Sequence, residues 1–205
     1  GVDYLKIASI DANNFHFCEF IAKKKHPTII STGMLTYKEI VKTQSIFKKY
    51  NTAHIFLHCT SAYPSDEKDK NLNCIPKLRS LLNEDVGFSG HGTGIAGAAG
   101  ATALGAKVIE KHVTLSKKML GPDHAASLEF NTFSYLVDTC RKVSISLGSS
   151  EKKFLNSEKI LHSILCRKFV VRKDLKKGAK LNSNNIKTAL TYSKNGLLPN
   201  QYYKI

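Results

Sequence analysis

The sequence lacks the features that define several classes of protein. No apolar run approaches the roughly 20 residues that a membrane-spanning helix needs, so we expect no membrane protein of that kind. The five cysteines are scattered and form no CxxC pair, which argues against a disulfide framework or a cysteine-ligated zinc site and for reduced thiols in the cytoplasm. No signal peptide opens the chain, which begins with Gly1 instead of Met, and we expect that its natural start is missing.

Acidic residues are also scarce. The chain has 16 Asp and Glu against 31 Lys and Arg, a net charge of +15, and much of the excess lies after Ser150. A basic tail can bind nucleic acid, but these lysines alternate with turn residues and lack both a helical stripe and interleaved aromatic residues. We favour a solvated basic surface, which would also attract small phosphate-bearing substrates, and we expect neither nucleic-acid nor membrane partners.

What is present is a regular alternation of strand and helix patterns. Hydrophobic residues make up 42% of the 205, enough for a substantial core. Strands alternating with helices at this spacing predict a parallel sheet with right-handed crossovers. The predicted strands are residues 5–8, 28–30, 54–57, 86–88 and 107–109.

Helix signals lie between these strands. Asn13 or Asn14 can cap a helix that carries Phe17, Phe20 and Ile21 on one face, and the predicted helix 131–147 ends at a glycine. Residues 94–104 form a small-residue helix that can pack closely. Thr36 and Glu39 form a TxxE capping box before a further helix.

Polar residues follow each predicted strand at its carboxyl end. Five such ends converge at the top of a β/α barrel, whereas an open doubly wound sheet would spread them along one edge. We therefore predict an α/β fold in which residues 1–148 form about the last five strand–helix units of a TIM (β/α)8 barrel. About three units would precede residue 1.

The sequence changes character after Gly148. Residues 149–160 are predicted to be a linker. Residues 161–205 combine strand-like pieces with turns and predict a small, mostly β domain that is cut off at its end.

Two histidines form the first candidate site. His91 and His112 follow adjacent predicted strands, so both imidazoles could reach one metal ion, although a chance pair among eight histidines is an equal alternative. Ser89 beside His91, and Glu110 beside His112, favour a site. Glu110 receives a secondary role, because its direction depends on the regularity of its strand.

A GxGxxG pattern at residues 92–97 suggests a dinucleotide site. The acidic residue expected about 20 positions later is absent, and small residues continue to Ala101. We favour close helix packing as its explanation.

Lys6 lies in the middle of an apolar strand. It is either an outward lysine or one that points into the barrel mouth to hold an anionic substrate. In the second case Ser9, Ser31, Thr32 and Ser61 would add hydroxyl donors.

Two loop residues complete the candidates. Tyr63 is either core or substrate wall. Asp123 is either a turn former or an acceptor for a sugar hydroxyl.

Taken in order, six motifs over nearly the whole chain resemble those of sialic acid synthases. They are Lys6-Ile7-Ala8-Ser9, Ser31-Thr32-Gly33-Met34, His58-Cys59-Thr60-Ser61-Ala62-Tyr63-Pro64, Gly87-Phe88-Ser89-Gly90-His91, residues 105–112, and Gly121-Pro122-Asp123-His124. The basic tail resembles the start of that family's antifreeze-like (SAF) domain.

The resemblance implies specific roles. His91 and His112 match the catalytic ligands of a divalent metal, Mn²⁺ or Mg²⁺, and Asp123 matches the catalytic acidic residue that binds the open-chain sugar. Phosphoenolpyruvate is held in the family by residues that match Lys6, Ser31, Ser61, Tyr63 and Ser89. The implied reaction joins phosphoenolpyruvate to an N-acylmannosamine or its 6-phosphate, in a homodimer whose SAF domain reaches the partner subunit.

Departures from the bacterial pattern favour the animal-type enzyme, which takes N-acetylmannosamine 6-phosphate and makes N-acetylneuraminate 9-phosphate. Gly90 replaces a typical Asp, and residues 188–191 lack the arginine of the bacterial SAF domain. The alternatives are a synthase for the unphosphorylated sugar and an inactive fragment that acts as an anion-binding or interaction module. The second arises because the family's upstream lysine and glutamate are not in this sequence.

Overall fold

The computed structural model describes residues 1–191 and 196–204, and these divide into two compact units, Gly1–Gly148 and Ser149–Ile205. No helix of the described residues is both long enough and apolar enough to cross a bilayer.

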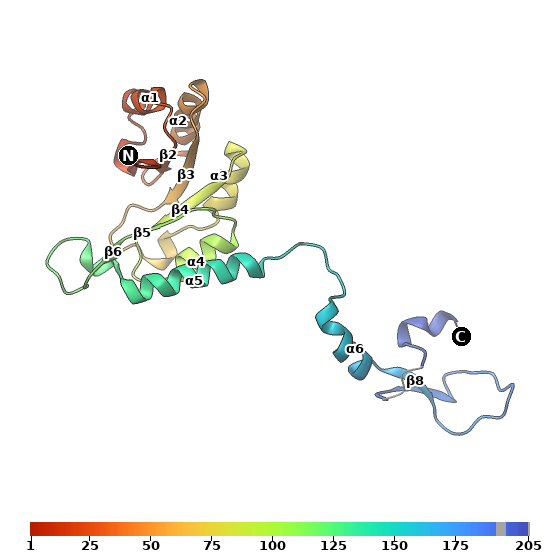
Figure 1. The fold of residues 1–205 in the computed structure, drawn as a ribbon. Coiled ribbons are helices and arrows are strands. Elements are labelled where there is room, and N and C mark those ends of the chain that lie inside the picture. The colour runs from red at the N-terminus through yellow and green to blue at the C-terminus, as the bar shows by residue number, and fades with distance from the viewer. Residues whose placement is uncertain (192–195, 205) are drawn as a thin grey trace. The chain divides into compact units, whose positions relative to one another are not determined.

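The first unit is built on a five-stranded parallel sheet (Figure 1). Its strands are β1 (Leu5–Ile7), β2 (Thr28–Ser31), β3 (His54–Cys59), β4 (Val86–Gly90) and β5 (Ile109–Lys111). They lie in the order β1-β2-β3-β4-β5, so each strand pairs with the next one along the chain. A sequential order has no switch point, which excludes the doubly wound alternative and confirms the partial barrel.

Four helices connect successive strands of this sheet: α1 (Phe15–Lys23), α2 (Tyr37–Lys49), α3 (Cys74–Leu82) and α4 (Ala96–Ala103). A fifth helix, α5 (Phe130–Ser146), ends the unit. The helix α5 lies alongside α4 (Figure 1). Between β5 and α5, β6 (Val113–Thr114) pairs with β7 (Leu128–Glu129). Short 3-10 turns occur at Ser9–Asp11, Glu67–Asp69 and His124–Ala126.

The core of this unit lies between one face of the sheet and the helices. Strand residues Ile7, Ile30 and Phe56 pack there against Phe47 of α2 and Leu78 of α3. Because side chains alternate along a strand, the neighbours of these residues point to the opposite face, which is the interior of the barrel. The core therefore fixes which strand residues can reach a site.

Helices α2 and α1 both begin at capping residues that the sequence predicts. The capping box of α2 is confirmed: the side chain of Glu39 binds the backbone of Thr36, and the Thr36 side chain accepts from the backbone of Glu39. Asn14 caps α1, and of the predicted apolar face Ile21 packs against the core, whereas Phe17 and Phe20 are exposed.

The fully buried residues of α1 are small. Cys18 and Ala22 are fully buried, and they are one turn apart on the helix. Small side chains let α1 approach its neighbours closely, and bulky phenylalanines are kept outside.

The second unit contains little regular structure. A 3-10 turn (Asn156–Glu158) leads into α6 (Lys159–Leu165), so the end of the predicted linker is helical. The strand β8 (Lys168–Val171) pairs antiparallel with β9 (Ile186–Ala189), and a last 3-10 helix covers Pro199–Lys204. The assignment of this unit to a SAF domain stays a prediction.

Candidate functional site

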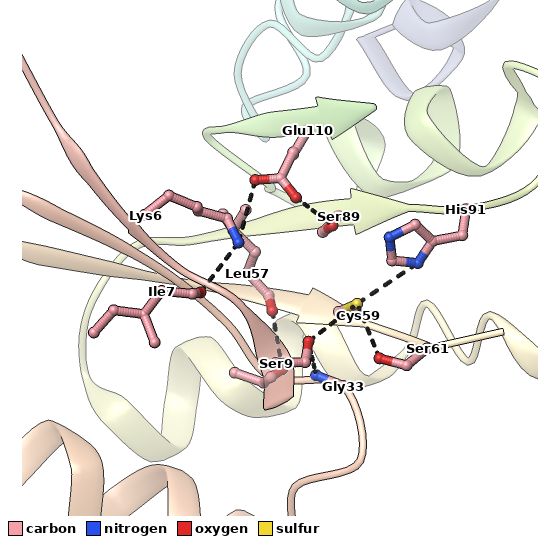
Figure 2. A network of polar contacts seen from close by, with 11 residues as sticks. Lys6, Ile7, Ser9, Gly33, Leu57, Cys59, Ser61, Ser89, His91 and Glu110 are labelled. Atoms are coloured by element: carbon pink, nitrogen blue, oxygen red, sulfur yellow. Dashed lines mark hydrogen bonds and ion pairs between the residues drawn. The ribbon is translucent and has the colours of Figure 1, made fainter. Parts of the chain in front are cut away.

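The candidate site lies where the carboxyl ends of the five parallel strands meet. In a β/α barrel this is the end that carries the catalytic side chains. Figure 2 shows side chains from β1, β3, β4 and β5 directed toward one another there. Residues that are as much as a hundred positions apart in the sequence are neighbours in this region.

An ion pair links the first strand of the sheet to the last. The ammonium of Lys6 in β1 lies 3.5 Å from Oε2 of Glu110 in β5, and both side chains are a little over one third exposed. Three strands separate these two in the sheet order, so a flat sheet could not bring them together. The contact therefore records how strongly the sheet curls, and it points Lys6 into the barrel.

Glu110 also holds a residue of β4. The hydroxyl of Ser89, which is buried, donates to Oε1 of Glu110 at 2.8 Å (Figure 2). One carboxylate thus orients both Lys6 and Ser89, two residues that the sequence assigns to an anionic substrate. Glu110 was predicted to be secondary, and it is central to the contacts at this end of the sheet.

Ser31, at the end of β2, has an unusual environment. Its hydroxyl oxygen is buried and has no hydrogen-bond partner among the described residues. An unsatisfied buried hydroxyl costs about 1–3 kcal/mol. A phosphate or carboxylate oxygen at this position would remove that cost.

His91 and His112 are brought together, as the sequence predicts. Their ring centroids are 5.1 Å apart, and the ring of Tyr63 packs against both, at 4.2 Å from His91 and 5.7 Å from His112. Tyr63 is half exposed and is therefore a wall at the mouth of the barrel and no part of the core.

The tautomer of His91 follows from its hydrogen bonds. Its Nδ1 lies 2.9 Å from the carbonyl oxygen of Thr60, so Nδ1 carries the proton and donates. Nε2 has no partner within residues 1–191 and 196–204, and its lone pair is available to a metal. A histidine whose other ring nitrogen donates to a backbone carbonyl is the usual arrangement for a metal ligand.

The two histidines make an open metal site at most. No group of three or more His, Cys, Asp or Glu side chains in the described part of the chain could enclose an ion. The remaining ligands of a metal would be substrate atoms and water, as in catalytic sites that keep positions free.

The two imidazoles differ in basicity. Burial lowers the pKa of His112, and the neighbouring His91 lowers it further. Burial acts in the same direction on His91, but the Cys59 thiol and the Thr60 carbonyl together raise its pKa above the ordinary value. The neutral form of His112 is the form that binds metal.

Asp123 lies in the connection between β6 and β7, at the start of a 3-10 turn, and is exposed. Its charge raises the pKa of His112, against the larger effects of burial and His91. It also contributes to the raised pKa of Tyr63, after burial and the charge of Cys59. The charge of Asp123 is therefore close enough to act on both His112 and Tyr63.

Ser61 and Ser9 meet at Cys59, the last residue of β3. The sulfur lies 3.6 Å from the Ser9 hydroxyl, 4.0 Å from the Ser61 hydroxyl and 3.8 Å from Nδ1 of His91 (Figure 2). Burial works to raise the pKa of this thiol, but the contacts with His91, Ser9 and Ser61 hold it below the ordinary value.

The roles of Cys59 and Gly33 were not predicted from the sequence. A Cβ atom on Gly33 would lie 2.1 Å from the Ser61 hydroxyl and 2.9 Å from that of Ser9. The position of Cys59 immediately before the Thr60-Ser61 pair was the one available signal. Nothing in the sequence links Gly33 to Ser61.

The GxGxxG pattern is explained by packing. A Cβ on Gly92 would meet the Lys70 ammonium at 2.8 Å, and one on Gly97 would meet its stem at 3.1 Å. Lys70 is buried between these glycines and pairs with Glu67. A lysine fills the space, which supports the packing explanation over the dinucleotide one.

Comparisons with known proteins agree with this geometry. The model of the NeuB family matches residues 1–152. Pseudaminic acid synthase of Campylobacter jejuni is 41% identical over 184 residues, which cover 89% of this chain and 53% of that protein. N-acetylneuraminate-9-phosphate synthase of Mus musculus is 40% identical over 182 residues, which cover 88% and 51%.

A solved structure is similar as well. The N-acetylneuraminic acid (sialic acid) synthetase of Leptospira borgpetersenii, in complex with citrate, superposes with a TM-score of 0.74 at 37% identity, over 78% of this chain and 56% of that one. The chain spans about half the length of the curated relatives it matches.

Proposed function

The chain belongs to the NeuB family, and we propose on that basis that it is the larger part of the catalytic barrel of a sialic-acid-type synthase. The reaction would join phosphoenolpyruvate to N-acetylmannosamine 6-phosphate and release phosphate, giving N-acetylneuraminate 9-phosphate. The observation that carries this proposal is the convergence of Lys6, Ser31 and Ser89 beside the His91–His112 pair at one end of the sheet.

Phosphoenolpyruvate would occupy the basic and hydroxyl-lined part of this region. Lys6 supplies a positive charge, and the unsatisfied hydroxyl of Ser31 supplies a hydrogen bond that the protein itself does not use. Glu110 fixes the direction of Lys6 and Ser89 before substrate arrives. Groups that are already oriented stabilise developing charge without the cost of reorganisation.

The open-chain sugar would lie on the other side, against Tyr63 and Asp123. A divalent cation, Mn²⁺ or Mg²⁺, held by His91 and His112, would polarise the aldehyde oxygen of the sugar when bound. C3 of phosphoenolpyruvate would attack the aldehyde carbon, water would add at C2, and phosphate would leave by C–O cleavage. Asp123 would accept hydrogen bonds from the sugar hydroxyls and hold the aldehyde in line.

The choice between the phosphorylated and the free sugar is the finer part of the proposal. Relatives of the two substrate kinds are 41% and 40% identical to this chain, so identity does not separate them. The absence of the bacterial arginine from residues 188–191, together with Gly90, supports the 6-phosphate. A homodimer, in which the second unit reaches the partner subunit, is proposed on the same resemblance.

The test measures phosphate release in a chain that carries these residues within a complete barrel. We expect turnover with Mn²⁺, phosphoenolpyruvate and N-acetylmannosamine 6-phosphate, with the 9-phosphate product identified by mass spectrometry. Turnover that is faster with the free sugar would replace the substrate assignment. Absence of turnover with either sugar would contradict the proposed function.

Lys6→Met tests the assignment of the two substrate regions. Removing the positive charge is expected to raise the KM for phosphoenolpyruvate by about tenfold or more, which is about 1.4 kcal/mol or more of lost binding, and to leave that for the sugar within about twofold. Lys142→Met is the matched control, since Lys142 lies on the exposed side of α5 and pairs with Asp138. An equal rise for both substrates would show that Lys6 does not belong to the phosphoenolpyruvate region.

A further inference from the structure

Cys59 is a buried residue that touches both halves of the proposed site. It ends β3, is 6% exposed, and has no assigned role in binding either substrate. Its sulfur contacts Ser9 and Ser61 on one side and Nδ1 of His91 on the other (Figure 2). Two hydroxyls of the proposed anion region, Ser9 and Ser61, and the proposed metal ligand His91 therefore all contact the same sulfur atom.

The direction of these hydrogen bonds follows from what each group has left to donate. The Ser9 hydroxyl accepts from the backbone N–H of Gly33 at 2.9 Å and donates to the sulfur. Nδ1–H of His91 points to the Thr60 carbonyl, with the sulfur beside it. The sulfur also lies 4.0 Å from the Ser61 hydroxyl, a contact in which either atom can be the donor.

The sulfur also fixes where the Ser61 hydroxyl lies. This hydroxyl contacts the Cys59 sulfur and hydrogen bonds with the Tyr63 side chain, and a hydroxyl held there can rotate to donate to a bound phosphate or carboxylate. The same sulfur restrains the ring of His91, whose Nε2 has no partner among the described residues. Both groups therefore depend on one sulfur for their position.

The cluster has room for three polar atoms only because Gly33 has no side chain. A Cβ there would lie 2.1 Å from the Ser61 hydroxyl, 2.9 Å from the Ser9 hydroxyl and 3.1 Å from the Cys59 sulfur. The Cys59 sulfur, the Ser61 hydroxyl and the Ser9 hydroxyl are thus all packed over the Cα atom of Gly33. Any other residue at position 33 would displace these three atoms, so their close packing depends on the glycine.

We propose that Cys59, packed on Gly33, is a positioning residue that orients Ser61 toward the anion and His91 toward the metal, and so couples the two binding events. The inference rests on the proposed function. Partners behind a metal-bound histidine typically change metal affinity by 10–100-fold when removed. The Thr60 carbonyl remains in every variant, so the lower end of that range applies.

The test compares two buried cysteines in the full chain. Cys59→Ala is the variant, and Cys18→Ala is its matched control, because Cys18 is fully buried but its sulfur contacts only backbone oxygens, at 3.6 Å. Mn²⁺ affinity is measured by the electron paramagnetic resonance signal of free Mn²⁺, with and without phosphoenolpyruvate. We expect Cys59→Ala to weaken Mn²⁺ binding about tenfold and to remove most of the tightening that phosphoenolpyruvate causes, while Cys18→Ala stays within about twofold.

Two further variants separate positioning from simple packing. Cys59→Ser keeps a hydroxyl that can reach the same partners after a small shift, and we expect it to recover part of the coupling. Gly33→Ala leaves Cys59 in place but pushes Ser61 away, and it should reproduce the loss of coupling. Equal behaviour of Cys59→Ala and Cys18→Ala in both affinity and coupling would overturn the inference.

A readout without metal distinguishes this inference from the proposed function. The ring nitrogens of His91 are observed in long-range ¹H–¹⁵N spectra of the metal-free protein. Signals that shift in Cys59→Ala and not in Cys18→Ala support the positioning role even where Mn²⁺ does not bind, which would count against the proposed function alone. Signals unchanged in both variants contradict the positioning role.

Discussion

The two units of the chain differ in how many hydrophobic side chains they bury. Among the described residues, Ile186 is the one buried hydrophobic side chain of the second unit, whereas the first unit contains both hydrophobic clusters. Helix α6 of the second unit exposes Ile160, Leu161, Ile164 and Leu165. A helix with its apolar residues exposed gains little from burial.

The same contrast holds for polar groups. In the first unit, hydrogen bonds and ion pairs such as Lys6–Glu110 and Ser89–Glu110 join different strands. In the second unit, most bonds link residues close in sequence, such as Glu158 to Leu155. A packed core holds side chains from distant strands in fixed positions, and it is this rigidity that makes a site possible.

The largest expected effect tests whether the chemistry belongs to the first unit alone. His112→Ala removes one of two proposed metal ligands, and we expect turnover in a complete barrel to fall roughly a thousandfold, about 4 kcal/mol. His162→Ala in α6 is the control, since its ring packs on Phe154 of the second unit. Comparable losses of turnover in the two variants would contradict the assignment of the chemistry to the first unit alone.

The next effect concerns stability. Phe56 lies at the centre of the first core and is 1% exposed, so Phe56→Ala should lower the free energy of unfolding by about 3–5 kcal/mol. Ile186→Ala should cost roughly 2 kcal/mol, and only in the second unit. Amide hydrogen exchange, which reports each unit separately, is the measurement, with exposed Phe20→Ala as a control within about 0.5 kcal/mol.

The smallest effect is a pH dependence of the first unit. The backbone and hydroxyl of Thr36 and then Asn13 lower the pKa of Glu39 to about 2. A carboxyl with a depressed pKa stabilises the fold above its unfolded value, about 4.5, and this contribution is lost as pH falls toward about 2. We expect the Tm to fall across this range in the wild type and the fall to be smaller in Glu39→Gln; identical slopes would contradict the role of the capping box.

Local signals in the sequence determined much of this fold. The alternation of apolar runs with helix caps predicted all five strands of the sheet, and the TxxE pattern predicted the start of α2. These features depend on residues only a few positions apart, so they can be recognised from the sequence alone. The placement of polar residues at strand ends likewise predicted that His91 and His112 would meet.

Only the tertiary structure decided which of these residues act together. The fifth strand runs over Ile109–Lys111 and not 107–109, which places Glu110 inside it, opposite Ser89. The curl of the sheet then brings Glu110 to Lys6, and the missing side chain of Gly33 lets Ser61 and Cys59 meet. The physical reason is that sequence spacing fixes which face of a strand a side chain occupies, whereas the curvature and close packing of the whole sheet fix what it touches.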